Sequence, residues 1–276
     1  MAHRYLPLFA ALGTGFCGSL TTFSSWMHDV FVAFANLESG STGRFRGVRS
    51  GSRVTWLYLT FHHLQFLSGL AVTIITLAGA NTALRVGVHV STFFPHRHTR
   101  RRHSGASQLS HASKRPLPRP QRHLLFLAIG PLFYIGAILL LALGPHSWRS
   151  RATFAIVLGP PGTFLRYELS RYLNAKSSSF PLGTFAANSL AVLIFAVTAI
   201  LQRRPTSSLG CAALQGVQDG FCGSLSTVST FVVELRNLGT RDSWRYAGVS
   251  WLTAQAIMVL LLGSYIWSGS NHHVAC

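Results

Sequence analysis

Residues 15–26 read G-F-C-G-S-L-T-T-F-S-S-W, and residues 220–231 read G-F-C-G-S-L-S-T-V-S-T-F. The first six letters are identical in the two copies, and the next six pair conservatively at the same offset. An acidic residue then follows each copy at the same distance, as Asp29 and Glu234. Agreement of this length at one offset indicates an internal duplication, which we expect to decide the fold.

Each copy places two glycines and a run of hydroxyl side chains inside a long apolar segment. Glycine lowers helix propensity, and Ser and Thr side chains can hydrogen-bond the backbone groups that a broken helix leaves free. Irregular backbone at membrane depth is tolerated only where it is buried in protein or lines a polar cavity. Because the pattern occurs twice, we favour a functional break in each helix over a face of small residues that only packs.

The composition is that of a membrane protein. Of the 276 residues, 49% are hydrophobic and only 11% are charged, whereas a soluble domain carries roughly a quarter charged residues. The 24 Lys and Arg against 6 Asp and Glu would also suit a nucleic-acid-binding protein. Against that class, the basic residues lie between long apolar runs, as in membrane-protein loops, and only Arg166 lies deep within one.

Seven apolar segments are long enough to cross a membrane as helices, for which about 20 residues are needed. We therefore predict an all-α integral membrane protein. The first copy of the repeat lies in the first segment and the second copy in the sixth, so the copies should cross in opposite directions and share a site near the midplane. The third segment has no counterpart and would supply the odd crossing that inverts the second half. The predicted segments are residues 6–34, 54–79, 123–143, 152–173, 181–201, 211–236 and 245–268.

The basic residues also predict which side of the membrane each end faces. Fifteen Lys and Arg fall on the side of the N-terminus and eight on the other side, which favours a cytoplasmic N-terminus by the positive-inside rule. Nine of the fifteen lie in one loop, and without that loop the balance reverses.

That loop, residues 85–122, differs from the rest of the chain. It holds nine Lys or Arg and four Pro with almost no sustained apolar run, so we expect a basic, disordered segment. Five histidines could in principle bind a metal, but their irregular spacing and flanking arginines argue against it. They are His89, His96, His98, His103 and His111.

The four cysteines show no disulfide or zinc spacing. We expect Cys17, Cys211, Cys222 and Cys276 to be small core residues. No cleavable signal peptide is expected either, since the N-terminus enters an apolar segment without the short apolar core and small-residue cleavage site of such a signal.

The repeated block resembles the third-helix signature of the bacterial Fluc (CrcB) fluoride channels, and the two-copy arrangement is similar to the fused eukaryotic FEX fluoride exporters. Residues 159–167, G-P-P-G-T-F-L-R-Y, resemble the first helix of that family, and residues 181–188, P-L-G-T-F-A-A-N, resemble the second. The resemblance implies an inverted-topology pair of four-helix repeats joined by a linker helix.

On this resemblance, the second repeat is complete and the first is partial. Residues 152–268 contain all four helices, residues 123–143 form the linker helix, and residues 85–122 lie outside the family core. Residues 1–84 contain only the third and fourth helices of a repeat, which would reflect a gene model that begins late or a native truncation.

The resemblance further implies two pores, each lined by an Asn of the second helix and by two aromatic rings from opposite repeats. One pore would use Asn188, Phe23 and Phe231. The other would use Trp26 and Val228, and so has lost one ring and enlarged the other. We therefore expect only the first pore to conduct. Without the resemblance, we would favour a polar contact between helices as the role of Asn188.

Other site residues follow from the same resemblance. Hydroxyl donors to the anion would come from Ser24, Thr227, Ser229 and Thr230. A structural sodium ion would be held by backbone carbonyls at Gly18, Thr21, Gly223 and Ser226, since carbonyl oxygens suit a hard cation. Arg166 would attract anions into a vestibule or anchor at headgroups.

The function implied is a passive fluoride channel that exports fluoride from the cytoplasm across the plasma membrane as a monomer. An ATP-driven pump is disfavoured, because the chain has no G-x-x-x-x-G-K-[S/T] loop. A proton-coupled anion transporter remains the main alternative, with a seven-helix receptor behind it and an enzyme last. Proton coupling would use a membrane carboxylate from among Asp29, Glu168, Asp219 and Glu234.

Overall fold

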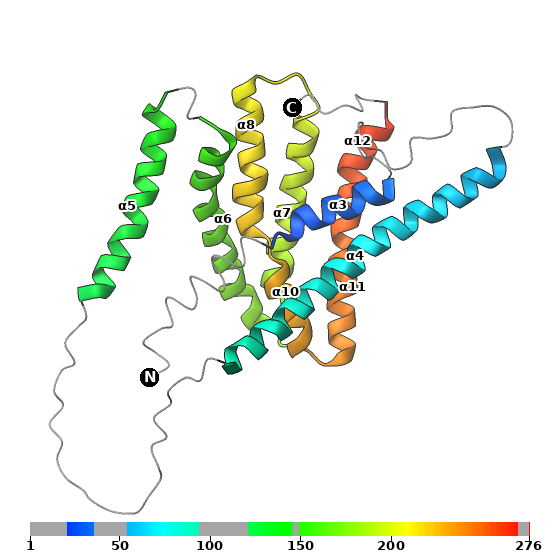
Figure 1. Ribbon diagram of the computed structural model, residues 1–276, viewed down its shortest axis with the longest axis horizontal. Coiled ribbons are helices and arrows are strands. Elements are labelled where there is room, and N and C mark those ends of the chain that lie inside the picture. The colour runs from blue at the N-terminus through cyan, green and yellow to red at the C-terminus, as the bar shows by residue number, and fades with distance from the viewer. Residues whose placement is uncertain (1–20, 36–53, 94–120, 146–148, 270–275) are drawn as a thin grey trace, which may run out of the picture.

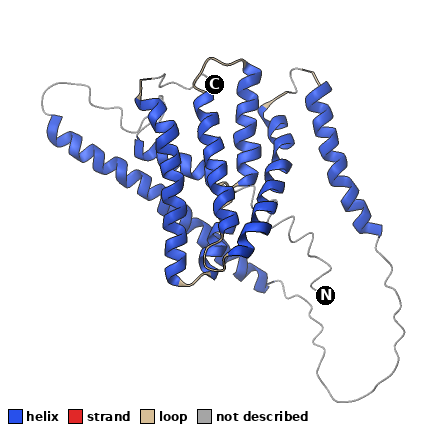
Figure 2. Cartoon of the chain, turned by 180° about the vertical axis from the view of Figure 1, so that it is seen from behind, coloured by secondary structure: helices blue, strands red, loops and turns tan. Residues whose placement is uncertain are grey.

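Helices make up the regular structure of the residues that this computed structural model describes, which are 21–35, 54–93, 121–145, 149–269 and 276. Within those ranges there is no strand (Figure 2). The predicted all-α class is therefore confirmed. The first half of the repeat block at residues 15–20 lies outside the described residues.

The helices follow the predicted apolar segments closely after residue 120. In chain order they are α3 (Phe23–Ala35), α4 (Val54–Phe93), α5 (Gln121–Leu143), α6 (Arg151–Leu173), α7 (Leu182–Leu201), α8 (Ser208–Gly216), α9 (Gly223–Leu225), α10 (Val228–Asn237), α11 (Thr240–Met258) and α12 (Ser264–Trp267). Two π-helical turns continue α8 and α11, at Val217–Cys222 and Val259–Gly263.

Helix α7 lies at the centre of the bundle, where it contacts α3, α6, α8 and α11 (Figure 1). Its buried face is built mainly from small residues, among them Ala187, Ala191 and Ala196, all fully buried. Small side chains let helix backbones approach closely, as in membrane helix bundles. The core sits around this face of α7.

Three helices within the described ranges are long and apolar enough to cross a membrane: Phe66–Gly87, Leu182–Leu201 and Thr240–Trp267. Many large apolar side chains point outward, such as Ile75 and Phe133, which are 69% and 77% exposed. Such outward faces suit lipid rather than water. The protein is a multi-pass integral membrane protein.

The predicted loop at 85–122 is wrong at its beginning, because α4 continues to Phe93. Arg85 and His89 are therefore exposed positions on a helix. The physical reason is the run Val86-Gly87-Val88, which keeps the stretch apolar enough to extend a long helix. His96, His98, His103 and His111 lie outside the described residues.

The prediction for the cysteines is wrong for two of the four. Cys211 and Cys276 form a disulfide, with their Cα atoms 5.5 Å apart. The pair is separated by 65 residues, so its proximity arises from the packing of the chain and leaves no trace in spacing. Cys222 is a buried free thiol, as expected, and Cys17 lies outside the described residues.

Helix α6 packs closely on the segment that follows α8. Ser224 Oγ donates to the carbonyl of Gly159 at 2.7 Å, across the two helices. A Cβ atom at Gly162 would collide with Ser224 Oγ and with the carbonyl oxygen of Phe221, and one at Gly220 would collide with the backbone of Ala155. Glycine is therefore required on both sides of this contact.

Candidate functional site

The second copy of the repeat is a broken helix, as predicted. Helix α9 ends at Leu225, and Ser226 and Thr227 are extended before α10 begins at Val228. Thr227 caps α10 by accepting a hydrogen bond from the N–H of Thr230 at 3.3 Å. In the first copy, Thr21 and Thr22 are likewise non-helical and precede α3.

The two copies of the repeat bind one another through a reciprocal pair of hydrogen bonds. The N–H of Ser24 donates to Ser226 Oγ at 3.1 Å, and the N–H of Ser229 donates to Thr21 Oγ1 at 3.2 Å. Ser229 and Ser226 are the repeat counterparts of Ser24 and Thr21, so exchanging the copies converts one bond into the other. The N–H of Val228 also donates to the Thr21 carbonyl at 2.8 Å.

We call this contact between the two copies the crossing. Helices α3 and α10 run from it toward opposite ends of the bundle. On α3, Phe31 lies beside Trp267, near the end of the last helix, with ring centroids 6.3 Å apart. On α10, Glu234 accepts a hydrogen bond from Tyr246, near the start of α11. Figure 1 shows α10 descending from the crossing while α3 extends away from it toward α12. This is the arrangement that an inverted repeat predicts.

Asn188 of α7 is fully enclosed beside the second break. Its side-chain oxygen accepts from the Thr227 N–H at 2.9 Å, and its side-chain nitrogen donates to the Thr227 carbonyl at 3.4 Å. The amide thus pairs with both backbone groups of the extended residue. One N–H of the Asn188 side chain is thus used in this contact, and its second N–H remains as a hydrogen-bond donor.

The aromatic residues that the resemblance assigns to the two pores lie in one cluster. Phe23 and Phe231 are in edge contact, with centroids 5.4 Å apart and an interplanar angle of 67°. Both are buried, and Phe231 also touches Tyr246 at 5.1 Å. Trp26 stacks edge-on against Phe23 at 5.3 Å.

Trp26 and Val228 line a cavity of about 430 Å³ between α3 and α4. Its wall also carries the hydroxyls of Thr21, Thr22, Ser25 and Thr76 and the carboxylate of Asp29. Trp26 and Val228, which we expect to belong to the pore that does not conduct, thus line the same cavity. Phe23 and Phe231 are not part of its lining.

The hydroxyls predicted to face the anion cluster around the crossing. Ser24 Oγ lies 3.1 Å from Ser226 Oγ, and Thr227 Oγ1 lies 3.1 Å from Ser229 Oγ and 3.4 Å from Thr230 Oγ1. Hydroxyl groups can rotate to donate toward an incoming anion. The structure therefore places the four predicted hydroxyls around the crossing, with the Ser226 hydroxyl beside them.

The acids that end the two copies have different surroundings. Glu234 accepts from Thr184 Oγ1 at 2.6 Å and from the Tyr246 hydroxyl at 2.8 Å. Asp29, its counterpart, has a side chain 69% exposed and lies 3.6 Å from His28. Sequence reasoning missed Thr184 and Tyr246. Thr184 stands one helical turn before Asn188, which is the only local signal that could have found it.

The other two predicted acids form ion pairs near helix ends. Glu168 lies 3.9 Å from Arg171, and Asp219 lies 2.8 Å from Arg151. Arg166, in contrast, is 3% exposed within α6, so its guanidinium lies inside the protein.

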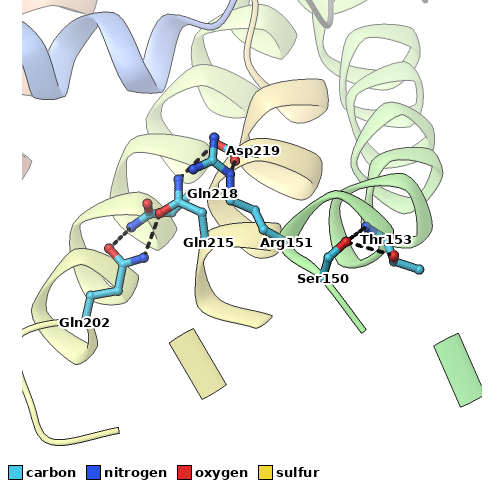
Figure 3. Close-up of polar contacts among 7 residues, drawn as sticks. All are labelled: Ser150, Arg151, Thr153, Gln202, Gln215, Gln218 and Asp219. Atoms are coloured by element: carbon cyan, nitrogen blue, oxygen red, sulfur yellow. Dashed lines mark hydrogen bonds and ion pairs between the residues drawn. The ribbon is translucent and has the colours of Figure 1, made fainter. Parts of the chain in front are cut away.

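A polar network that the sequence did not reveal joins α7 to the π-helical turn after α8 (Figure 3). Buried Gln218 donates to Thr198 Oγ1 and to Gln202 Oε1, both at 3.1 Å. Gln202 then donates to Gln215 at 3.0 Å, and Gln215 donates to Asp219 at 3.1 Å. The three amides thus donate one to the next, and the last of them, Gln215, donates to the Asp219 carboxylate, so the network holds this end of α7 and α8 together.

The residues predicted to hold sodium fit a hard cation in chemistry. Ser226 is extended and Thr21 is non-helical, and backbone carbonyl oxygens are ligands that a hard cation takes. The Thr21 carbonyl accepts the N–H of Val228 at 2.8 Å. Gly223 lies against Thr22, and Gly18 is outside the described residues. Among the described residues, no cluster of His, Cys, Asp and Glu could hold a metal.

Comparison with known proteins places these features in a family. Residues 153–266 match the model described as CrcB-like protein, Camphor Resistance (CrcB). The chain is 33% identical over 122 residues to the fluoride-specific ion channel FluC of Pseudomonas aeruginosa, covering 93% of that protein. No solved structure matches the chain.

Longer relatives match nearly the whole chain. Fluoride export protein 1 of Neurospora crassa is 34% identical over 289 residues, which is 99% of this chain and 51% of the relative. Fluoride export protein 1 of Candida albicans is 34% identical over 95% of this chain and 63% of the relative. The chain therefore spans about half to three fifths of the length of these two proteins.

Proposed function

The chain belongs to the CrcB-like protein family, and we propose that it conducts fluoride passively out of the cytoplasm across the plasma membrane. The names of the similar proteins, fluoride export protein and fluoride-specific ion channel, support fluoride as the ion. A channel protects the cell without an energy-coupling site, since the membrane potential itself drives an anion outward.

One observation carries the proposal: the edge contact of Phe23 and Phe231 beside the crossing of the two breaks. The edge of a phenyl ring is electropositive, so it attracts an anion without a fixed positive charge. A fixed charge would bind a small anion too tightly for rapid release. The two rings come from opposite copies of the repeat, and one path would run along them.

The polar groups around the rings would replace the water that fluoride loses. The hydroxyls of Ser24, Thr227, Ser229 and Thr230 can donate in turn, and the free N–H of Asn188 adds an amide donor. Several weak donors in sequence allow entry and exit, because no single position holds the ion firmly. On this proposal the Trp26 and Val228 side does not conduct.

A structural sodium ion would sit between the crossing backbones, held by carbonyls of Thr21, Gly223, Ser226 and Gly18. The carbonyl dipoles of these two backbone segments repel each other, and the ion would hold the segments together. Because both copies of the repeat lie in one chain, we propose that the protein works as a monomer.

Flux from liposomes tests the proposal. The purified protein is reconstituted in vesicles loaded with potassium fluoride, and a potassium ionophore sets the potential while an electrode follows external fluoride. We expect rapid fluoride efflux that scales with the potential and little chloride efflux. Equal fluoride and chloride rates, or no efflux from folded protein, would contradict the proposal.

A proton-coupled transporter is a second candidate, favoured by Glu234, a half-buried carboxylate that follows Phe231 by three residues on α10. A carboxylate held by Thr184 and Tyr246 next to the path could carry a proton with the anion. In vesicles clamped at zero potential, a pH gradient alone would then drive fluoride uphill, and Glu234→Gln would abolish that movement. Passive conduction predicts no net movement beyond the fluoride gradient in either protein.

A further inference from the structure

A disulfide bond links two segments at one end of the molecule; we call it the tie. Cys211 lies in the first turn of α8 and is bonded to Cys276, with Cα atoms 5.5 Å apart, within the range that a disulfide can span. The N–H of Cys276 also donates to the carbonyl of Gln202 at 3.2 Å. The tie therefore lies over the connection between α7 and α8.

The tie marks a definite end of the bundle. Gln202 follows the last residue of α7, and Ser207 caps the start of α8. Figure 1 places the C-terminal residue near these two helix ends. The connections from α6 to α7 and from α10 to α11 lie at the other end, because each helix crosses the bundle once.

Disulfides form and persist in oxidising compartments and are rare in the cytosol. We propose that Cys211 and Cys276 are oxidised to a disulfide during passage through the secretory pathway, and that this end of the bundle faces the outside of the cell. The two thiols lose two protons and two electrons to the disulfide of a secretory-pathway oxidoreductase, which becomes a dithiol.

The distribution of basic residues supports the same orientation independently. By the alternation of the predicted spans, the side opposite the tie carries fifteen Lys and Arg, whereas the side of the tie carries eight. Basic residues accumulate on the cytoplasmic side of membrane proteins. Nine of the fifteen belong to residues 85–122, and that stretch gives the charge balance the same sign as the orientation from the disulfide.

This orientation assigns the two ends of the crossing. Helix α10 runs toward the cytoplasmic end, so Glu234 with Thr184 and Tyr246 lies on the cytoplasmic side of the crossing. Helix α3 runs toward the outer end, where Phe31 meets Trp267. The inference rests on membrane insertion and not on the proposed fluoride conduction.

Thiol labelling on intact cells tests the proposal. In a Cys17→Ala, Cys222→Ala background, only the Cys211 and Cys276 pair remains to react. A membrane-impermeant polyethylene glycol maleimide is applied before and after a membrane-impermeant phosphine reductant, and adducts are read as gel shifts. We expect no adduct before reduction and at least one adduct after it, without permeabilisation.

Matched variants fix the orientation. Adding Cys211→Ser to this background leaves Cys276 as a free thiol, which should react on intact cells without reductant. Ser178→Cys lies at the other end, between α6 and α7; in a background with Cys211→Ser and Cys276→Ser added, it should react only after permeabilisation. Adducts before reduction in the parent would overturn the disulfide. Adducts that require permeabilisation would overturn the orientation. If a further variant fails to reach the cell surface, the Cys17→Ala, Cys222→Ala protein alone decides both the disulfide and the orientation.

Discussion

The side-chain hydroxyls of Ser24 and Ser226 lie 3.1 Å apart, where the two copies of the repeat meet. Ser226 Oγ also accepts the Ser24 N–H and donates to the carbonyl of Cys222 at 2.9 Å. One side chain therefore satisfies groups on both copies of the repeat. In a membrane interior without water, such backbone groups need a protein partner.

Ser226→Ala should destabilise the protein, because it leaves the buried N–H of Ser24 without its acceptor. An unsatisfied buried donor costs roughly 1–3 kcal/mol. The midpoint of thermal unfolding in detergent should fall accordingly. Ser226→Thr retains the hydroxyl and is the control. Equal midpoints for Ser226→Ala and the parent would show that this bond contributes nothing.

Asn188→Ala should abolish fluoride efflux and also lower stability. The substitution removes both partners of the extended Thr227 backbone and the amide donor beside the path. Asn174 offers a matched control, since its side-chain oxygen accepts from the Gly183 N–H at 2.6 Å at the start of α7, away from the crossing. Asn174→Ala should cost about 1 kcal/mol as a lost cap but keep its flux per folded molecule. If the two variants lose flux equally, Asn188 acts through the position of α7 alone.

Phe231→Ile should reduce fluoride efflux at least tenfold, because isoleucine fills most of the ring's volume and has no electropositive edge. Val228→Ile places the same side chain in the lining of the Trp26 cavity, at the equivalent pore position of the other side, and should leave efflux near that of the parent. Both are compared by initial efflux rate at equal reconstituted protein. Comparable losses in the two variants would contradict a single conducting side.

The sequence predicted the crossing well because its cause is local. Glycines and hydroxyls at 220–227 break a helix wherever it is placed, and a second copy of the same pattern defines a symmetric partner. The pairing of Phe23 with Phe231 came from the resemblance, and the structure brings these two rings into contact.

Features that depend on distant packing were not predictable in this way. The Cys211 and Cys276 pair and the Gln218 network join residues whose spacing carries no signal. The extension of α4 past residue 84 shows a different limit. Charge density pointed to a loop there, but a short apolar run outweighs one arginine.

Gly162→Ala should destabilise the bundle, because its Cβ would collide with Ser224 Oγ and with the carbonyl oxygen of Phe221. Both atoms belong to the segment that leads into the second break, so helix α6 would be pushed away from it. Overpacking of this kind costs roughly 1–3 kcal/mol.

Gly159→Ala, one turn earlier on α6, is the matched control, since a Cβ there meets nothing within 4 Å. It should be neutral or slightly stabilising, because alanine favours a helix by roughly 1 kcal/mol over glycine. Unfolding midpoints of the two variants should therefore move apart in detergent. A Gly162→Ala protein as stable as Gly159→Ala would show that α6 does not depend on close contact with the broken helix. The lower midpoint for Gly162→Ala alone would instead show that this contact helps to hold the crossing in place.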